Sequence, residues 1–214
     1  GLIFFPYLLV KKEYKKILYS FIFLIILGFL PLLFYPSFSS FTDLYIAWWN
    51  ELIAELNAKQ NLLSSGNHTI FSVLSRFTPI KYLLANNLSK IIYQLALLII
   101  IGMGILKYVR YSNGPRKIIT EMMILISLIP LLAFTNDNAF IFELPLIMYI
   151  ILHSEKLHVV GKILLISGCL LIGGNIYEIF GSEIKLFLSS ISIYTFGTII
   201  LLSVLYFYEL KDRK

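Results

Sequence analysis

Long apolar stretches alternate with short basic segments along this chain. The stretches at residues 17–36, 88–107, 118–134, 139–153, 162–179 and 189–208 carry almost no charge, and residues 1–10 have the pattern of the end of an earlier stretch. A helix needs about 20 predominantly apolar residues to cross the hydrocarbon core of a bilayer. The pattern therefore predicts an all-α, polytopic transmembrane helix bundle with about six full spans and the end of an earlier one.

The composition supports lipid rather than water as the main solvent. Of the 214 residues, 58% are hydrophobic and 14% are charged, and the mean hydropathy is +0.84. A globular domain carries about 25% charged residues to cover its surface, so an ordinary soluble domain is excluded. The net charge is +6, but the basic patches are short and lack interleaved aromatic residues, so no nucleic-acid partner is expected.

Lysine and arginine concentrate on one side of the predicted spans. Short loops that stay in the cytoplasm collect positive charge, so the richer side is predicted to be the inner one. The inner set has thirteen members: Lys11, Lys12, Lys15, Lys16, Lys107, Arg110, Arg116, Lys117, Lys156, Lys162, Lys211, Arg213 and Lys214; the outer set has five: Lys59, Arg76, Lys81, Lys90 and Lys185. The basic loops and the carboxyl-terminal tail should therefore face the cytoplasm, with tight outer turns at 135–138 and 181–188.

This topology leaves one large outer segment at residues 37–87 within a single transmembrane domain, 1–214. Its first part, about residues 41–57, repeats apolar residues at the spacing of one helical face, with polar residues opposite. Trp48 and Trp49 lie in the middle of this helix, where amphipathic rings favour the headgroup layer. We expect an amphipathic helix lying on the outer membrane surface; the alternative is that it packs on neighbouring spans.

The start of the sequence has the features of a fragment. It begins with Gly1 rather than Met, and the apolar residues 1–10 run directly into a lysine cluster, so we expect a fragment of a longer protein.

Cys169, the single cysteine, lies in an apolar run. One cysteine excludes an internal disulfide or a cysteine metal site, and this thiol is predicted to be a small buried hydrophobe.

The first group of candidate site residues surrounds a predicted outer turn. Asn136, Asp137 and Asn138 lie in the turn, and Glu143 follows about 7 Å deeper at the helical rise of about 1.5 Å per residue. Pro145 removes a backbone donor and bends the helix. These residues predict a polar outer rim, because a carboxylate at membrane depth needs a partner or a wet cavity. The alternative is a capped turn that satisfies the N–H groups of the following helix.

The second group is the element Asn67–Arg76. A Gly-Asn turn opens a short helix beside His68, and Arg76 lies about two turns later. Free N–H groups beside a cation can hold a phosphate. Any loop can carry a histidine, however, and residues 67–69 also form a glycosylation sequon. The remaining buried or terminal titratable residues Glu121, His153 and His158 are interpreted as structural, and no phosphate loop, Ser-His-Asp order or zinc-ligand run is present.

Several of these residues carry a resemblance to a known family. They are Pro6 before Lys11 and Lys12, Trp49 and Leu52 in the outer helix, the run 66–70 (Gly-Asn-His-Thr-Ile) and the run 74–76 (Leu-Ser-Arg). In these positions the chain resembles the DUF2029 or glycosyltransferase family 87 membrane enzymes, which carry an Asn-Gln-Ser-Leu-like element followed by an arginine in an outer loop. Their later motif is matched loosely by residues 134–140 and Leu144-Pro145. His68 stands where the family usually has Gln, and Thr69 where it has Ser.

The resemblance implies a GT-C type fold and an activity. Such an enzyme moves a sugar, mannose-like, from a polyprenyl-phosphate carrier to a glycan or glycolipid acceptor on the extracytoplasmic face, here of a bacterial plasma membrane, without a nucleotide or other cofactor. Its catalytic base is typically an acidic residue in the first outer loop, which would precede this chain, so the catalytic residue is unknown here. Asn67, His68 and Arg76 would then contact the leaving phosphate, and Asp137 and Glu143 would bind sugar hydroxyls.

Two further interpretations remain open. A surface-polysaccharide polymerase or ligase would also face outward, but more outer arginines than Arg76 would be expected. A membrane transporter subunit would show broken helices and polar residues near the midplane. The enzyme hypothesis makes a geometric prediction that the others do not require: the element Asn67–Arg76 and the rim Asp137–Glu143 should approach each other across one outer cavity.

Overall fold

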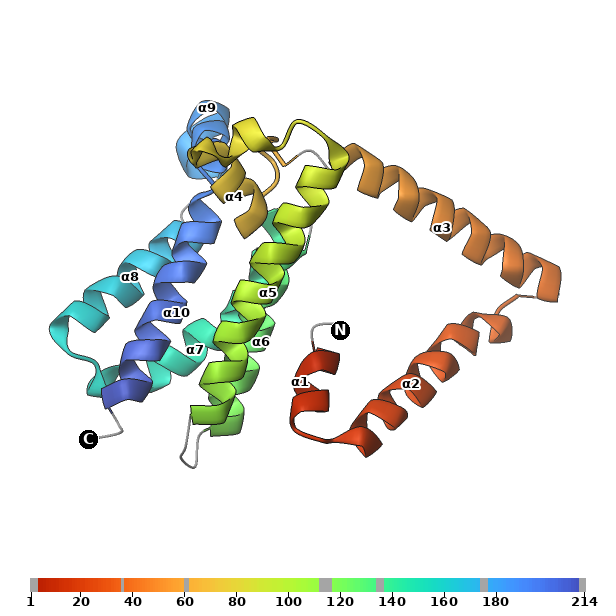
Figure 1. Ribbon diagram of the computed structural model, residues 1–214, viewed down its shortest axis with the longest axis horizontal. Coiled ribbons are helices and arrows are strands. Elements are labelled where there is room, and N and C mark those ends of the chain that lie inside the picture. Colours follow the sequence, from red (N-terminus) through yellow and green to blue (C-terminus); the bar gives the residue numbers. More distant parts are fainter. Residues whose placement is uncertain are drawn as a thin grey trace. The chain divides into compact units, whose positions relative to one another are not determined.

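The computed structural model is all-helical over the residues that it describes, which are 4–35, 37–59, 62–111, 117–133, 137–173 and 177–211. The chain divides into two compact units, Gly1–Gln60 and Asn61–Lys214. Figure 1 shows the helices of each unit in the colours of the sequence. The division falls inside the segment 37–87 that the charge pattern places outside the membrane.

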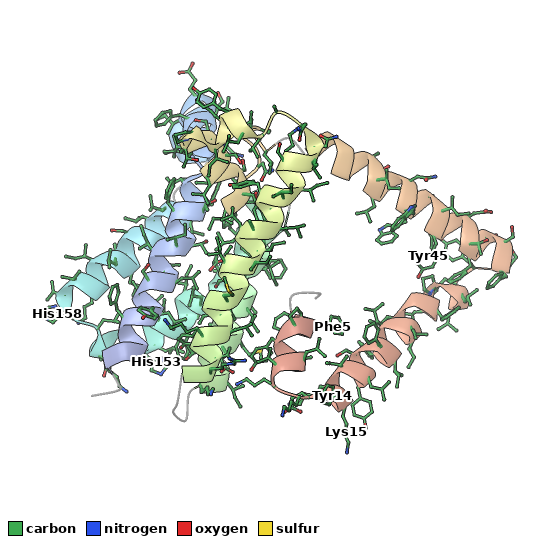
Figure 2. All side chains as sticks on the ribbon, in the orientation of Figure 1. Phe5, Tyr14, Lys15, Tyr45, His153 and His158 are labelled. Atoms are coloured by element: carbon green, nitrogen blue, oxygen red, sulfur yellow. The ribbon has the colours of Figure 1, made fainter. Side chains whose placement is uncertain are left out.

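The first unit consists of three α-helices and a 3₁₀ turn: α1 (Phe4–Val10), α2 (Tyr14–Phe29), η1 (Leu30–Leu33) and α3 (Phe38–Lys59). Helix α3 matches the predicted amphipathic helix. Its residue Phe41 stacks on Phe29 at 5.9 Å between ring centroids, and the Tyr45 hydroxyl donates a hydrogen bond to the carbonyl of Gly28. Figure 2 shows Tyr45 beside the end of α2. Part of the apolar face of α3 therefore packs on α2 and η1, while Trp48 and Trp49 are exposed.

The second unit contains the other helices. They are α4 (Ile70–Phe77), η2 (Pro79–Leu83), α5 (Asn87–Tyr111), α6 (Lys117–Leu132), η3 (Asp137–Glu143), α7 (Leu144–Leu152), η4 (Ser154–Lys156), α8 (Val159–Gly173), α9 (Tyr177–Ser190) and α10 (Ile193–Lys211). The main apolar core lies between α7, α8 and α10 and contains Leu146, Tyr149, Ile150, Leu165, Leu201, Val204 and Leu205. Figure 1 shows α8 and α10 side by side.

In the part of the chain that the structure describes, two helices are long and apolar enough to cross a membrane, Tyr14–Leu33 and Asn87–Arg110. A third candidate is the pair Gly181–Ser190 and Ile193–Phe207, which is bent by 58°. None of the residues in the most apolar window of either long helix is buried. Exposed apolar surface on this scale is rare on soluble monomers but is the normal surface of a helix in lipid. These features are those of an integral membrane protein.

The remaining predicted spans correspond to shorter helices. The stretches 139–153 and 162–179 overlap the apolar helices Asn138–Leu152 and Val159–Gly173, which are each 10–17 residues long. The stretch 118–134 overlaps α6, which has 16 residues and contains Pro130. A straight span needs about 20 residues. The tight turn predicted at 181–188 is wrong: these residues form helix, with a kink at Gly181 where φ is 76°.

Candidate functional site

The short helix α4 begins with a turn that its own side chains hold. The Oδ1 atom of Asn67 accepts hydrogen bonds from the Thr69 N–H at 3.1 Å and the Thr69 hydroxyl at 2.7 Å. Thr69 in turn caps the helix, because its Oγ1 atom accepts from the Ser72 N–H at 3.3 Å. Asn67 is buried, and its oxygen is used within the turn. A turn opens α4 at the predicted place, but the N–H groups of Thr69 and Ser72, which the sequence predicted to be free for a phosphate, are bonded to Asn67 and Thr69.

Further contacts fix α4 in the second unit. The Ser72 hydroxyl donates to the Leu62 carbonyl at 2.7 Å, and the Tyr93 hydroxyl of α5 donates to the Phe71 carbonyl at 2.9 Å. Phe71 belongs to a small core with Leu62 and Leu84. This anchoring gives Arg76, in the last turn of α4, a defined position.

His68 is fully buried between α4 and the link from α9 to α10. Its Nδ1 atom lies 3.3 Å from the Ser192 hydroxyl and its Nε2 atom 3.5 Å from the Ser189 hydroxyl. Its backbone carbonyl accepts a hydrogen bond from the Thr195 hydroxyl. The edge of its ring meets Tyr194, with 5.2 Å between centroids. The histidine therefore connects two segments that are more than 120 residues apart in the sequence.

Arg76 reaches the same link. Its Nη1 atom donates to the Ser190 carbonyl at 2.7 Å, and its Nη2 atom donates to the Asn67 carbonyl at 3.2 Å and to the Ser192 hydroxyl. Ser192 has a φ of 55°, a left-handed conformation that ends α9 and lets α10 start in a new direction. The guanidinium thus holds the bend between these two helices.

The charge of Arg76 has no anionic partner among the side chains that the structure describes, because all three of its acceptors are neutral. Its buried Nε atom donates to none of the described groups. Burial lowers the pKa of Arg76 below its usual value, but a guanidinium stays protonated in proteins. The site therefore has a half-buried positive charge and one nitrogen, Nε, without an acceptor among the described groups.

The two predicted rim residues whose side chains the structure describes, Glu143 and Asn138, lie in different surroundings. Glu143 is fully buried and faces the hydroxyls of Ser127 and Thr198, whereas Asn138 is exposed. Asn136 and the side chain of Asp137 lie outside the described residues, although the backbone of Asp137 begins η3.

The element Asn67–Arg76 does meet the segment Asp137–Glu143, but through aromatic rings. The ring centroids of His68 and Phe140 are 6.1 Å apart, and Phe140 stacks on Tyr194 at 5.1 Å. Phe140 and Tyr194 are both buried in an apolar cluster. The contact between the two elements is therefore packed and apolar at this point.

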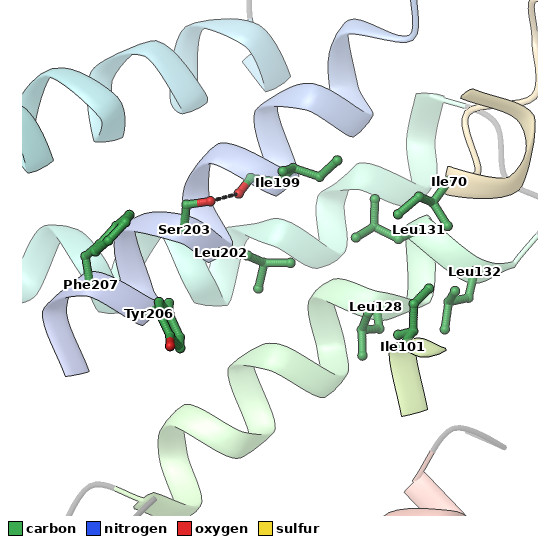
Figure 3. Close-up of a pocket in the computed structure, with 10 residues that line it drawn as sticks. All are labelled: Ile70, Ile101, Leu128, Leu131, Leu132, Ile199, Leu202, Ser203, Tyr206 and Phe207. Atoms are coloured by element: carbon green, nitrogen blue, oxygen red, sulfur yellow. Dashed lines mark hydrogen bonds between the residues drawn. The ribbon is translucent and has the colours of Figure 1, made fainter. Parts of the chain in front are cut away.

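An open pocket of about 390 Å³ lies in the second unit, between α5, α6 and α10 (Figure 3). Its lining is almost entirely apolar: Ile70, Ile101, Leu128, Leu131, Leu132, Ile199, Leu202, Ser203, Tyr206 and Phe207. The one serine donates its hydroxyl to the Ile199 carbonyl at 2.8 Å. Such a lining suits a hydrocarbon chain. Ile70 begins the helix that ends near Arg76, about 9 Å further along at the rise of about 1.5 Å per residue.

His153, at the end of α7, has a structural partner. The Nδ1 atom of His153 lies 2.8 Å from the Tyr149 carbonyl, and Figure 2 shows His153 and His158 at the two ends of the connection between α7 and α8. Within the described residues, no three His, Cys, Asp or Glu side chains come together as a metal site.

The sequence analysis did not identify the hydroxyl residues that surround these candidates. Ser189, Ser190, Ser192 and Thr195 contact His68 or Arg76, and Ser127 and Thr198 face Glu143. The available signal was the run Ser189-Ser190-Ile191-Ser192 inside an apolar stretch. Hydroxyls in apolar helices bond to nearby backbone or to other helices, so such a run indicates a bend or a polar contact.

Comparison with known proteins identifies no relative. No protein-family model matches the chain, and no curated protein or solved structure matches it.

Proposed function

We propose that the protein is a membrane glycosyltransferase of the GT-C type. It moves a sugar, mannose-like, from a polyprenyl-phosphate carrier to a glycan or glycolipid acceptor on the extracytoplasmic face. The proposal combines the resemblance of residues 66–76 to glycosyltransferase family 87 with one structural observation, the half-buried guanidinium of Arg76 that has only neutral acceptors. A carboxylate supplied by a segment outside this chain acts as the catalytic base.

The unpaired charge supports an anionic ligand. A charge removed from water is costly unless an opposite charge compensates it, and the neutral oxygens around Arg76 compensate it only in part. A planar guanidinium binds phosphate oxygens with two parallel hydrogen bonds. When the sugar leaves its carrier, negative charge grows on the phosphate, and a fixed cation stabilises that charge most strongly in the transition state.

The apolar cavity supports a lipid-linked ligand rather than a soluble phosphate. Helix α4 carries Ile70 at the edge of this cavity and Arg76 in its last turn. A carrier with an anionic head and a hydrocarbon tail has the same order of polar and apolar groups. The proposal includes a bundle of about six spans, in which the shorter helices α6, α7 and α8 line the site inside the membrane.

The test is transfer from a radiolabelled polyprenyl-phosphate sugar by the full protein, with Arg76→Lys and Arg76→Ala compared with wild type. Loss of the charge-assisted contact should cost about 2 to 4 kcal/mol, which is roughly two to three decades of rate. Arg76→Lys should fail almost as badly, because an ammonium cannot form the paired contact. Binding of the carrier should decline less than turnover.

Arg110 supplies a matched control, because it is exposed in the last turn of α5. Arg110→Lys and Arg110→Ala should keep near wild-type transfer. Since Arg76 also holds the bend between α9 and α10, the unfolding midpoint of each variant is measured in parallel. Near-normal turnover in both Arg76 variants would end the phosphate assignment, and loss of turnover that follows the loss of folded protein would count against it as well.

A secondary transporter is the second candidate, and two observations favour it. Helices α9 and α10 form a pair bent by 58°, and Glu143 is a fully buried carboxylate among apolar helices. Broken helices and buried ionisable residues near the midplane are typical of transporters. Solute uptake into proteoliposomes without sugar transfer would favour this candidate, whereas transfer without uptake would exclude it.

A further inference from the structure

A second open pocket, of about 270 Å³, lies between the start of α8 and the last turns of α10. Its lining contains two basic side chains, Lys156 at the end of η4 and His158 just before α8. The rest of the lining is apolar and includes Leu164 of α8 and Val204 and Phe207 of α10. Figure 2 shows His158 near the beginning of α8. We call this site the basic-rimmed pocket.

The inner wall of the basic-rimmed pocket belongs to the main apolar core. Val204 is fully buried in that core, and Leu157 and Leu164 pack against it. The outer side is open, because the side chain of Phe207 is 62% exposed and that of Val160 is 61% exposed. The pocket is therefore an apolar recess with a fixed floor, and its mouth opens toward the surroundings of the helices.

The volume of the pocket limits the kind of group that it can hold. A water molecule occupies about 30 Å³ in the liquid, and a methylene group has a similar size, so the pocket of about 270 Å³ holds roughly nine methylene groups. A helix of another protein is about 10 to 12 Å wide with its side chains and is too large to enter. Part of a single hydrocarbon chain has the right size and polarity.

The rim of the pocket carries positive charge. The ammonium of Lys156 forms no ion pair with a described side chain. Glu155 precedes Lys156 in η4, but it does not line the pocket. His158 is exposed and adds a second charge when it is protonated. The pocket therefore combines a cationic rim with an apolar interior, which matches a molecule with an anionic head and a hydrocarbon chain.

The predicted topology identifies the source of such a molecule. Lys156 and Lys162 belong to the side that the charge pattern predicts to be cytoplasmic, together with the basic residues of the carboxyl-terminal tail. The cytoplasmic leaflet contains anionic phospholipids, and basic pockets between helices on that side bind their head groups. A soluble anion would leave the apolar interior unused, and a zwitterionic lipid would leave the positive charge of the rim unbalanced.

We propose that the basic-rimmed pocket binds one anionic phospholipid, with part of an acyl chain between α8 and α10 and the phosphate beside Lys156 and His158. The site is separate from Arg76: Phe207 follows Ser192, a contact of Arg76, by fifteen positions, which is about 22 Å at the helical rise of about 1.5 Å per residue. Neither basic residue lines the larger pocket beside α5. The proposal therefore does not depend on whether the protein transfers sugars or transports solutes.

The test is native mass spectrometry of the purified full chain in detergent, titrated with dioleoyl phosphatidylglycerol or dioleoyl phosphatidylcholine. These lipids have the same chains and differ in head-group charge. The wild-type protein should bind one phosphatidylglycerol between about fivefold and 30-fold more tightly than phosphatidylcholine, which corresponds to one or two cations at about 1 kcal/mol each.

Two lysine variants separate the pocket from general surface charge. Lys156→Gln should weaken the binding of phosphatidylglycerol by about fivefold, the effect of one basic residue beside an anionic lipid, and leave phosphatidylcholine binding unchanged. Lys162→Gln is the matched control, because Lys162 is an exposed lysine of α8 that does not line the pocket. It removes the same charge and should keep wild-type binding.

Two glycine variants test the apolar interior. A Cβ atom at Gly161, which lines the pocket, would lie 3.3 Å from Cβ of Leu157, another lining residue. In Gly161→Leu the new side chain or a displaced Leu157 therefore takes up pocket volume, and the binding of both lipids should weaken by about tenfold or more, as loss of about two buried methylene groups does. Gly173→Leu is the control on the same helix, because a Cβ atom at Gly173 would have no atom within 4 Å.

The unfolding midpoint of each variant is measured in parallel, and if Gly161→Leu does not fold, the two lysine variants still decide the assignment. Equal affinity of the wild-type protein for the two lipids overturns the proposal. Equal losses in Lys156→Gln and Lys162→Gln overturn it as well, because they assign the preference to general surface charge. Undiminished binding in folded Gly161→Leu places the lipid elsewhere, and displacement of phosphatidylglycerol by excess inorganic phosphate assigns the rim to a soluble anion; either result overturns the proposal.

Discussion

Helices α8 and α10 approach each other closely at two glycines, Gly168 and Gly197, and this gives a sharp prediction. A Cβ atom at Gly197 of α10 would lie 2.7 Å from Cγ1 of Ile172, 3.1 Å from Cβ of Leu171 and 3.1 Å from the carbonyl oxygen of Gly168. The carbonyl cannot turn away as a side-chain end can. Gly197→Ala therefore forces α8 and α10 apart by a few tenths of an ångström.

The expected loss of stability follows from a comparison with a glycine at which an added Cβ atom would meet no other atom. An added methyl group in a tight interface costs about 1 to 3 kcal/mol, while replacing glycine by alanine in a helix gains up to about 1 kcal/mol. Gly104 of α5 has no atom within 4 Å of an added Cβ, so Gly104→Ala reports the gain alone. The midpoint of Gly197→Ala should therefore lie below that of Gly104→Ala by about 2 to 12 °C.

Gly168→Ala should act in the same direction, because its Cβ would lie 2.7 Å from Cδ2 of Leu201, a fully buried residue. Both changes push the same pair of helices apart, so the double variant should lose less than the sum of the two single losses. The assay is thermal unfolding of the purified chain in detergent. Equal midpoints for Gly197→Ala and Gly104→Ala would refute the close contact between α8 and α10.

Two further predictions test the bend and the topology. Thr195→Val removes the hydroxyl that donates to the buried His68 carbonyl and should lower the unfolding free energy by about 1 to 3 kcal/mol. The control Ser203→Ala removes a local hydrogen bond on α10 and should lower the unfolding free energy less. A larger loss for Ser203→Ala than for Thr195→Val in denaturant titrations would contradict this. In a cysteine-free background, an impermeant maleimide added to intact cells should label Ser65→Cys and leave Ser154→Cys unlabelled. The reverse pattern would invert the topology.

The sequence predicted the long helices well because their pattern is uniform. Stretches 17–36 and 88–107 correspond to Tyr14–Leu33 and Asn87–Arg110, and the periodic segment 41–57 corresponds to α3. In each of them, one apolar or amphipathic pattern continues for four or more turns. Such a pattern dominates local propensity, so only the ends were displaced by a few residues.

The helices in the last part of the chain were harder to predict because the breaks between them involve only one or two residues. Gly181 and Ser192 have positive φ values, and they kink α9 and end it. Ser192 does not interrupt the average hydrophobicity of the stretch 189–208, so the sequence pattern predicts one span where the structure has a bend. The partners of Arg76 on the α9–α10 link are more than 110 residues away in the sequence, and local pattern carries no information about such contacts.

The predicted position of Glu143 was wrong for a different reason: the helix before it is of another type than the sequence analysis assumed. The sequence analysis assumed an α-helix after Asn138 and placed the carboxylate about 7 Å deep. The structure has the 3₁₀ helix η3 here, which rises about 2.0 Å per residue instead of about 1.5 Å. Five residues then advance about 10 Å. The carboxylate lies correspondingly further along the chain axis and faces Ser127 and Thr198 rather than an outer rim.

One short stretch of α10 connects all of these features. Thr195 holds the His68 carbonyl, and Thr198 faces Glu143; residues three apart share one face of a helix, so both contacts lie along one side of α10. Gly197 is about 160° or more around the helix from Thr195 and meets α8 on another side. A shift of this single turn would therefore change the contact of Thr195 with His68, the contact of Thr198 with Glu143 and the contact of Gly197 with α8 together.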